Sequence, residues 1–208
     1  MKTINTQKTI KLVAIIFISA LSFTACSDDH DHDDHDDHEH EDEITQVVYT
    51  LTNTSDAKDT VTFTFTDEDG EGGAEGTPNV VGSLKANTSY TGVLKLKNLE
   101  DNEDVSAEII EMDAEDHEVF YTTDIAGLVF TTTDEDANGH ALGFENTATT
   151  ANAGSGSLTI SVIHEAKKPN DGTITDALSG AGTTDTEVSF KNISVSGAAV
   201  LEAVKTLK

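Results

Sequence analysis

The sequence predicts a mainly β protein: an antiparallel β-sandwich of immunoglobulin-like architecture, with one short helix and a disordered N-terminal tail. Apolar residues alternate with threonine from Ile44 onward, which is the period-two pattern of half-buried strands. Roughly seven such segments are separated by turn-rich stretches, and one segment alone has helical spacing. Several strands with one helical crossover fit a sandwich. The tryptophan and the disulfide of true immunoglobulin domains are missing, because the chain has no Trp and one Cys.

Two predicted strands carry apolar triplets on one face and threonine on the other: Val47, Tyr49 and Leu51 in the first, and Val61, Phe63 and Phe65 in the second. Further strands are expected near residues 89–97, 117–123, 127–133, 157–164 and 186–196. The turn-rich segments Asp69 to Pro78 and Thr149 to Gly156 separate some of them.

Residues 103–116 are predicted to form the short helix. Asn102 is a suitable N-cap, and Val105, Ile109 and Met112 repeat at helical spacing, with acidic residues in the first turn. A second short helix is possible in the C-terminal extension 197–208, where the apolar residues are Val200, Leu201, Val204 and Leu207.

The N-terminus has the order of a signal peptide over residues 1–25. Lysines precede an apolar run from Leu12 to Leu21, and small residues lead to Cys26, the one cysteine. The run is shorter than the roughly 20 residues of a permanent transmembrane helix. We therefore expect export, cleavage before Cys26 and lipidation of its thiol. A cleaved soluble protein with a stray thiol and an uncleaved anchor are the alternatives.

Cys26-Ser27-Asp28-Asp29 resembles the lipoprotein start of Bacteroidota-type bacteria, in which acidic residues after the cysteine accompany export to the cell surface. A broader similarity to small acidic lipoproteins of those bacteria, a group without an assigned activity, rests on Thr66–Gly70, Leu84–Tyr90, His117–Tyr121, His164-Glu165 and Thr186–Phe190. The resemblance implies an outer-membrane lipoprotein facing the cell surface or the periplasm. Some members are labelled type 1 periplasmic binding fold superfamily, which implies a two-lobed α/β architecture that the strand pattern does not predict. The group implies no catalytic residues.

The charge of the chain limits its partners. The formal net charge is −27, and without residues 1–25 it is −30, because nine lysines then face 39 acidic residues and there is no arginine. Such a surface repels nucleic acids and anionic lipid headgroups and attracts cations. Residues 44–196 suit one domain of ordinary size.

Residues 28–43 form the most biased segment, with only aspartate, glutamate and histidine. Its charges repel one another and it has nothing apolar to bury, so a disordered spacer is expected. Neutral imidazoles are ligands for Zn, Cu or Ni, and the carboxylates raise the local cation concentration. The segment is therefore predicted to bind Zn or another divalent transition metal, although it can equally be a spacer with incidental histidines. The candidate ligands are His30, His32, His35, His38 and His40.

A second candidate cation site follows the predicted strand at 127–133. The twelve-residue calcium-loop pattern D-x-[DN]-x-[DN]-G-x5-E is matched by Asp134, Asp136, Asn138, Gly139 and Glu145, with His140 inside the loop. The preceding strand argues against an EF-hand, and the turn chemistry of a hairpin tip explains the same residues equally well.

Three histidines remain outside the tail. His117, His140 and His164 each lie beside or near a carboxylate in the sequence, and only convergence in space would make them a metal site. No nucleophilic or phosphate-binding motif occurs, so an enzyme is not expected. The leading hypothesis is a membrane-anchored metal-binding lipoprotein that serves an outer-membrane uptake receptor. The alternative is a surface adhesion module with loops stiffened by Ca.

Overall fold

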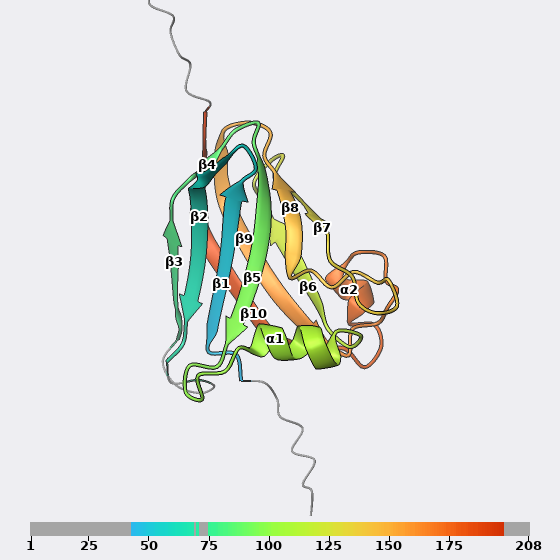
Figure 1. The fold of residues 1–208 in the computed structure, drawn as a ribbon. Coiled ribbons are helices and arrows are strands. Elements are labelled where there is room, and N and C mark those ends of the chain that lie inside the picture. The colour runs from blue at the N-terminus through green and yellow to red at the C-terminus, as the bar shows by residue number, and fades with distance from the viewer. Residues whose placement is uncertain (1–42, 69, 71–74, 198–208) are drawn as a thin grey trace, which may run out of the picture. The chain divides into compact units, whose positions relative to one another are not determined.

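The computed structural model describes residues 43–68, 70 and 75–197, which form two packed β-sheets and two short helical segments (Figure 1). The mainly β class and the two-sheet sandwich are confirmed. The predicted signal peptide, Cys26, the tail histidines and the C-terminal helix lie outside the described residues.

The strands divide into a six-stranded and a four-stranded sheet. The larger has the order β3-β2-β1-β5-β8-β7 and the smaller β4-β10-β9-β6; all pairs are antiparallel except β4 with β10. The bounds are β1 Gln46–Asn53, β2 Asp56–Thr66, β3 Thr77–Val81, β4 Leu84–Lys85, β5 Ser89–Lys97, β6 Glu118–Thr123, β7 Val129–Thr132, β8 Glu145–Thr149, β9 Gly154–His164 and β10 Thr183–Ser196. The immunoglobulin-like part of the predicted architecture stays a prediction.

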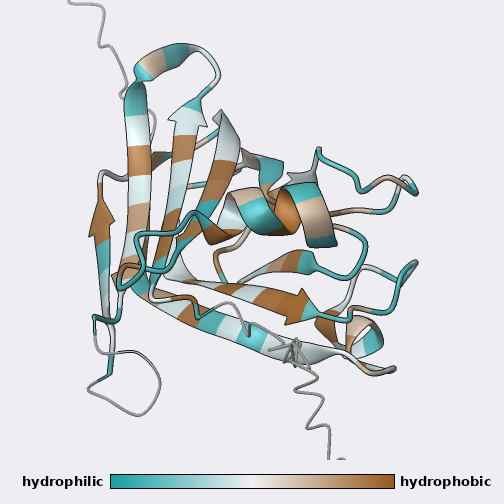
Figure 2. Cartoon of the chain, turned by 60° about the horizontal axis from the view of Figure 1, so that its bottom comes forward, coloured by the Kyte–Doolittle hydropathy of each residue, from teal (hydrophilic) through white to brown (hydrophobic). Residues whose placement is uncertain are grey.

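Alternation of apolar and polar residues produces the core. In β1 Val47, Tyr49 and Leu51 are fully buried while Val48, Thr50 and Thr52 on the other face are half-buried, and Figure 2 shows hydrophobic and hydrophilic residues in bands along the strands. Aromatic rings join the two sheets, with ring centroids 5.4 Å apart for Phe63 and Phe190 and 5.0 Å apart for Tyr49 and Tyr121. Burial of these rings is a major source of stability in a sandwich of this size.

Several elements differ from the sequence prediction. The strand β3 was not predicted: it begins in the last two residues of the predicted turn segment and continues beyond it, and its residues are mostly exposed because it is the edge of its sheet. In β8 the buried positions are the small or polar Asn146 and Ala148, so no apolar alternation marks it. The turn predicted up to Gly156 ends earlier, since β9 begins at Gly154. A one-turn helix, α2 (Ile174–Ala177), was also not predicted.

The predicted helix exists but is shorter and capped by a different residue. It begins as α1 (Val105–Glu108), and the side chain of Asp104 accepts the N–H of Ala107. Asn102 has a φ of 58° and is not the cap. Asp104 is one of the strongest N-cap types and lies directly before the first helical residue.

The helix then continues as a π-helix, η1 (Ile109–Asp113), and this changes which residue faces the core. Hydrogen bonds from i to i+5 widen the turn, so the position that returns to the core after Ile109 is Ala114, which packs against it. Met112, predicted to share the buried face, is instead 76% exposed. At the start of the helix the hydroxyl oxygen of Ser106 accepts the backbone N–H of Leu96 in β5, which ties this end to the larger sheet. From there the helix runs towards the smaller sheet (Figure 1).

We expect Phe190→Ala to lower the free energy of unfolding by about 3 to 5 kcal/mol, because it leaves a cavity between the sheets. Val129→Ala, at a residue 56% exposed on β7, is the control and should cost less than about 1 kcal/mol. Denaturant unfolding followed by circular dichroism measures both. Equal losses would contradict the assignment of Phe190 to the core.

Candidate metal centre

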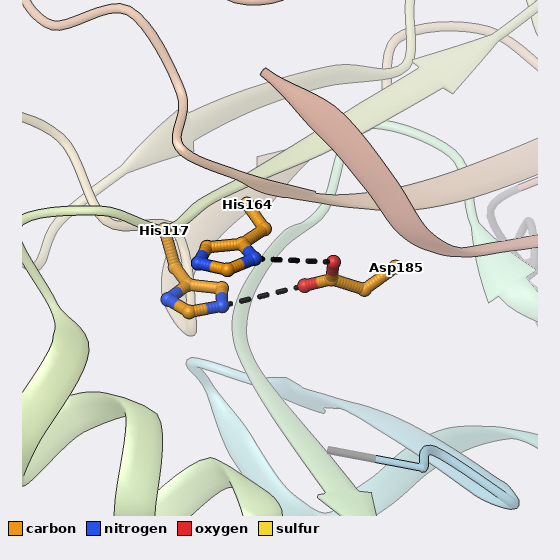
Figure 3. A group of neighbouring side chains, drawn as sticks. All are labelled: His117, His164 and Asp185. Atoms are coloured by element: carbon orange, nitrogen blue, oxygen red, sulfur yellow. Dashed lines mark ion pairs between the residues drawn. The ribbon is translucent and has the colours of Figure 1, made fainter. Parts of the chain in front are cut away.

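Two histidines and one aspartate meet at one end of the smaller sheet. His117 directly precedes β6, His164 is the last residue of β9, and Asp185 lies in β10 (Figure 3). Glu118 pairs with Ile163 in the antiparallel ladder, so the next position along places His117 opposite His164. Adjacent strands therefore bring together residues that are far apart in the sequence.

A β-bulge brings in the carboxylate. Thr184 pairs with Ile163 and Thr186 with Val162, which leaves Asp185 as an extra residue outside the ladder. An extra residue bends its strand and redirects side chains. The Asp185 carboxylate points at both imidazoles, and each of its oxygens faces a different ring.

The spacing of the ligand atoms suits a small divalent ion. The Nε2 of His117 is 3.3 Å from one oxygen of Asp185, and the Nδ1 of His164 is 3.9 Å from the other. The three ligand atoms lie within 4.8 Å of one another. Two ligands bound to tetrahedral zinc at about 2.1 Å are separated by about 3.4 Å, so both distances to Asp185 are close to those around a bound ion.

A backbone carbonyl orients His117. Its Nδ1 lies 3.0 Å from the carbonyl oxygen of Asp113, the last residue of η1, which also accepts the backbone N–H of Asp116 in the following turn at 3.1 Å. The carbonyl accepts the Nδ1–H, so the Nε2 lone pair faces Asp185 when the ring is neutral. Histidines that bind metals generally have such a second hydrogen bond, which fixes the tautomer and the ring orientation.

His164 differs from His117 in its freedom to move. The two rings are stacked, with centroids 4.6 Å apart and planes inclined by 3°. A metal ion lies near the plane of each imidazole that binds it, so two parallel rings hold one ion only after one of them rotates. His117 is 5% exposed and fixed by Asp113, whereas the His164 side chain is 47% exposed. His164 is therefore the ring that must turn.

Without a metal, protonation of His117 stabilises the cluster. Burial alone would lower the pKa of His117, but hydrogen bonds to Asp185 and to the Asp113 carbonyl, with the charges of both aspartates, raise it above its ordinary value. The proton and a metal ion thus compete for the same nitrogen.

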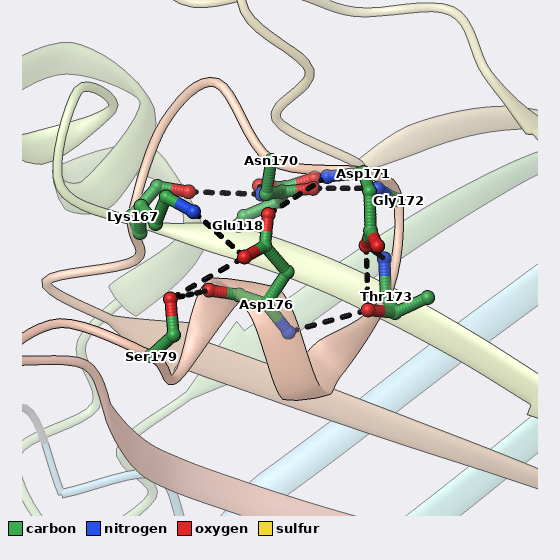
Figure 4. A network of polar contacts seen from close by, with 8 residues as sticks. All are labelled: Glu118, Lys167, Asn170, Asp171, Gly172, Thr173, Asp176 and Ser179. Carbon is green, nitrogen blue, oxygen red and sulfur yellow. Dashed lines mark hydrogen bonds and ion pairs between the residues drawn. The ribbon is translucent and has the colours of Figure 1, made fainter.

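The loop after His164 is held by a dense set of polar contacts (Figure 4). Asn170 donates to the buried carboxylate of Glu118 at 2.6 Å, and Lys167 pairs with Asp176 at 2.7 Å. Burial raises the pKa of Glu118, although the Asn170 bond opposes it. Glu118 directly follows His117, so these contacts fix the backbone on both sides of the centre.

The predicted calcium loop forms the hairpin connection between β7 and β8. The oxygens of Asp134 accept the N–H groups of Gly143 and Glu145 at 2.9 and 3.0 Å. Asp136 accepts the N–H groups of Asn138 and His140, both at 2.9 Å. The side chains of Asp134, Asp136, His140 and Glu145 do not bring three ligand atoms together as the metal centre does. Turn chemistry accounts for this acidic segment, and calcium binding stays a prediction.

His140 is separate from the metal centre. Its Nδ1 lies 3.6 Å from Asp136, whose buried carboxylate also pairs with the nearly buried Lys168 at 3.1 Å. Burial opposes the charge of Asp136, but the bonds from His140 N–H and Lys168 keep the pKa of Asp136 below its ordinary value. The Lys168 ammonium also donates to the carbonyl of Ala114, at 2.8 Å.

In comparisons with known proteins, no protein-family model, curated protein or solved structure matches this chain. The resemblance to acidic lipoproteins therefore stays a prediction. No helix in the described part of the chain is long and apolar enough to cross a bilayer.

The sequence pointed to two of the three candidate ligands. His117 and His164 were considered, and their places at the start of one predicted strand and the end of another agree with a shared end of an antiparallel pair. Asp185 was missed because the predicted strand began one residue later and no sequence pattern marked a bulge.

We expect the contribution of His117 to the stability of the metal-free protein to fall as the pH rises. A histidine whose pKa is higher in the folded than in the unfolded protein stabilises the fold by binding a proton. This stabilisation is complete below the unfolded pKa of about 6.5 and is lost as the pH rises through the folded pKa. The difference in unfolding free energy between the parent and His117→Asn should therefore shrink from pH 5.5 to 8.5. Asparagine keeps a donor near Asp113 and removes Nε2. Chemical denaturation with a chelator present measures this, His140→Asn is the control, and a constant difference across this range would contradict it.

Proposed function

We propose that this protein is an exported, membrane-anchored lipoprotein that binds a divalent transition metal, zinc foremost, at His117, His164 and Asp185. The observation that carries the proposal is the convergence of their three ligand atoms within 4.8 Å. Two imidazoles and one carboxylate are a ligand set that binds zinc with a fourth position open to water or to another ligand. Export and lipidation rest on the N-terminal sequence pattern.

The support for the metal comes from the surroundings of the ligands. His117 has the second hydrogen bond expected of a metal ligand, and the Glu118 and Asn170 contacts hold the adjacent backbone. The strongly acidic chain concentrates cations near its surface. An open, half-exposed site suits a protein that takes up and passes on an ion better than one that needs a permanent structural metal.

The five tail histidines are a second, separate candidate, so the test removes them first. In a variant with His30, His32, His35, His38 and His40 replaced by Asn, calorimetric titration at pH 7.5 should still show one equivalent of zinc. Adding His117→Asn should weaken that binding at least about 100-fold, since even the loss of an outer-shell partner of a ligand costs about 10- to 100-fold. Zinc at 100 times its Kd should stabilise the tail variant by about 2.7 kcal/mol.

Matched controls identify the site. His140→Asn in the same background should bind zinc like the tail variant, because His140 is held at Asp136. Binding should weaken strongly at pH 5.5, where protons occupy the imidazoles. If the tail variant binds no zinc at pH 7.5, the folded centre is not a metal site. The difference in stoichiometry between parent and tail variant measures the contribution of the tail.

A further inference from the structure

A small hollow lies beside the outer face of η1. It has a volume of about 220 Å³ and is bounded by η1 and by the β7–β8 connection. A cavity of about 150 Å³ accommodates benzene, so the hollow has room for one large apolar side chain. Its lining residues are Ile110, Met112, Ala114, Ala137 and Leu142, together with the acidic Glu111, Glu115, Glu135 and Asp136.

Two apolar side chains at the rim of this hollow are unusually exposed, whereas Leu142 is buried. Met112 is 76% and Ile110 46% exposed, and both come from the π-helical turn that directs Met112 away from the core. Single exposed apolar residues are common and mean little. Here two of them border the same hollow, and π-helical turns occur frequently at functional sites.

The charge around the hollow is of one sign. Glu111, Glu115 and Glu135 are exposed, whereas the fourth acid, Asp136, is neutralised by its buried pair with Lys168. The described lining contains no lysine, and the chain contains no arginine. An apolar floor with three unneutralised carboxylates repels anionic and purely polar partners and favours an apolar group flanked by positive charges.

The base of the hollow is fixed. Lys168 donates to the Ala114 carbonyl and to Asp136, which joins the end of η1 to the β7–β8 connection. A preformed site loses little entropy on binding. We propose that the hollow is a docking site for a partner protein, and that it receives an apolar side chain carried by a lysine- or arginine-rich segment.

The chain provides its own reporter for this site. It has two methionines, Met1 and Met112, so labelling with ε-¹³C-methionine gives one NMR signal inside the hollow, which Met112→Leu identifies. The test adds three capped probe peptides to the metal-free full chain in detergent: Lys-Lys-Leu-Lys-Lys, Lys-Lys-Gly-Lys-Lys and Glu-Glu-Leu-Glu-Glu. The first should shift the Met112 signal with half-saturation at or below about 1 mM, and the other two should bind at least about tenfold more weakly.

Variants test both parts of the recognition. Ile110→Ser should abolish the shift, while Val129→Ser, at a similarly exposed residue on β7, should not. Glu111→Gln with Glu115→Gln should weaken binding several-fold, whereas Glu100→Gln with Glu103→Gln removes the same charge elsewhere and should have little effect. Absence of a Met112 shift, equal binding of the glycine or acidic peptide, or insensitivity to Ile110→Ser would overturn the proposal. Because the protein is metal-free, these outcomes do not depend on zinc binding.

Discussion

The C-terminal end of η1 determines how this end of the molecule is built. Its last carbonyl groups have no partner within the helix, and a helix C-terminus attracts donors with positive charge. Two side chains supply such donors: His117, four residues further on, donates to the carbonyl of Asp113 beside the Asp116 N–H, and Lys168, distant in the sequence, donates to the carbonyl of Ala114. The first bond orients a histidine of the candidate metal centre, and the second supports the base of the neighbouring hollow.

Excess negative charge is the second constraint on this region. In an acidic protein with few lysines, each buried carboxylate needs a hydrogen-bond or charge partner of its own, because an unpaired buried charge is costly. Asp136 has Lys168 and two backbone N–H groups, and Glu118 has Asn170. Asp185 has only histidines among the partners described for its side chain, so its counter-charge depends on pH or on a bound cation. This difference separates a structural carboxylate from one suited to binding metal.

The sequence was informative where side-chain periodicity reports burial. Val47, Tyr49 and Leu51 occupy alternate positions and are buried as predicted, because one face of β1 lies in the core. Periodicity carries no signal for β8, whose inward residues are small or polar, or for the exposed edge strand β3. A prediction from periodicity also assumes regular helix geometry. Met112 was therefore predicted on the buried face, although the helix widens into a π-helix there and Met112 is exposed.

The candidate metal centre could likewise be predicted only in part from the sequence. His117 and His164 were identified as residues that would matter only if they converged, and convergence depends on strand register, which one sequence does not reveal. Asp185 depends on a local irregularity in that register, so its role appears only when Thr184 and Thr186 are seen to pair with consecutive residues of β9. A regular β10 would have had no residue outside the ladder at this point. The bulge thus places a carboxylate beside two stacked imidazoles at the end of the sheet, where one of those rings has room to turn towards an incoming ion.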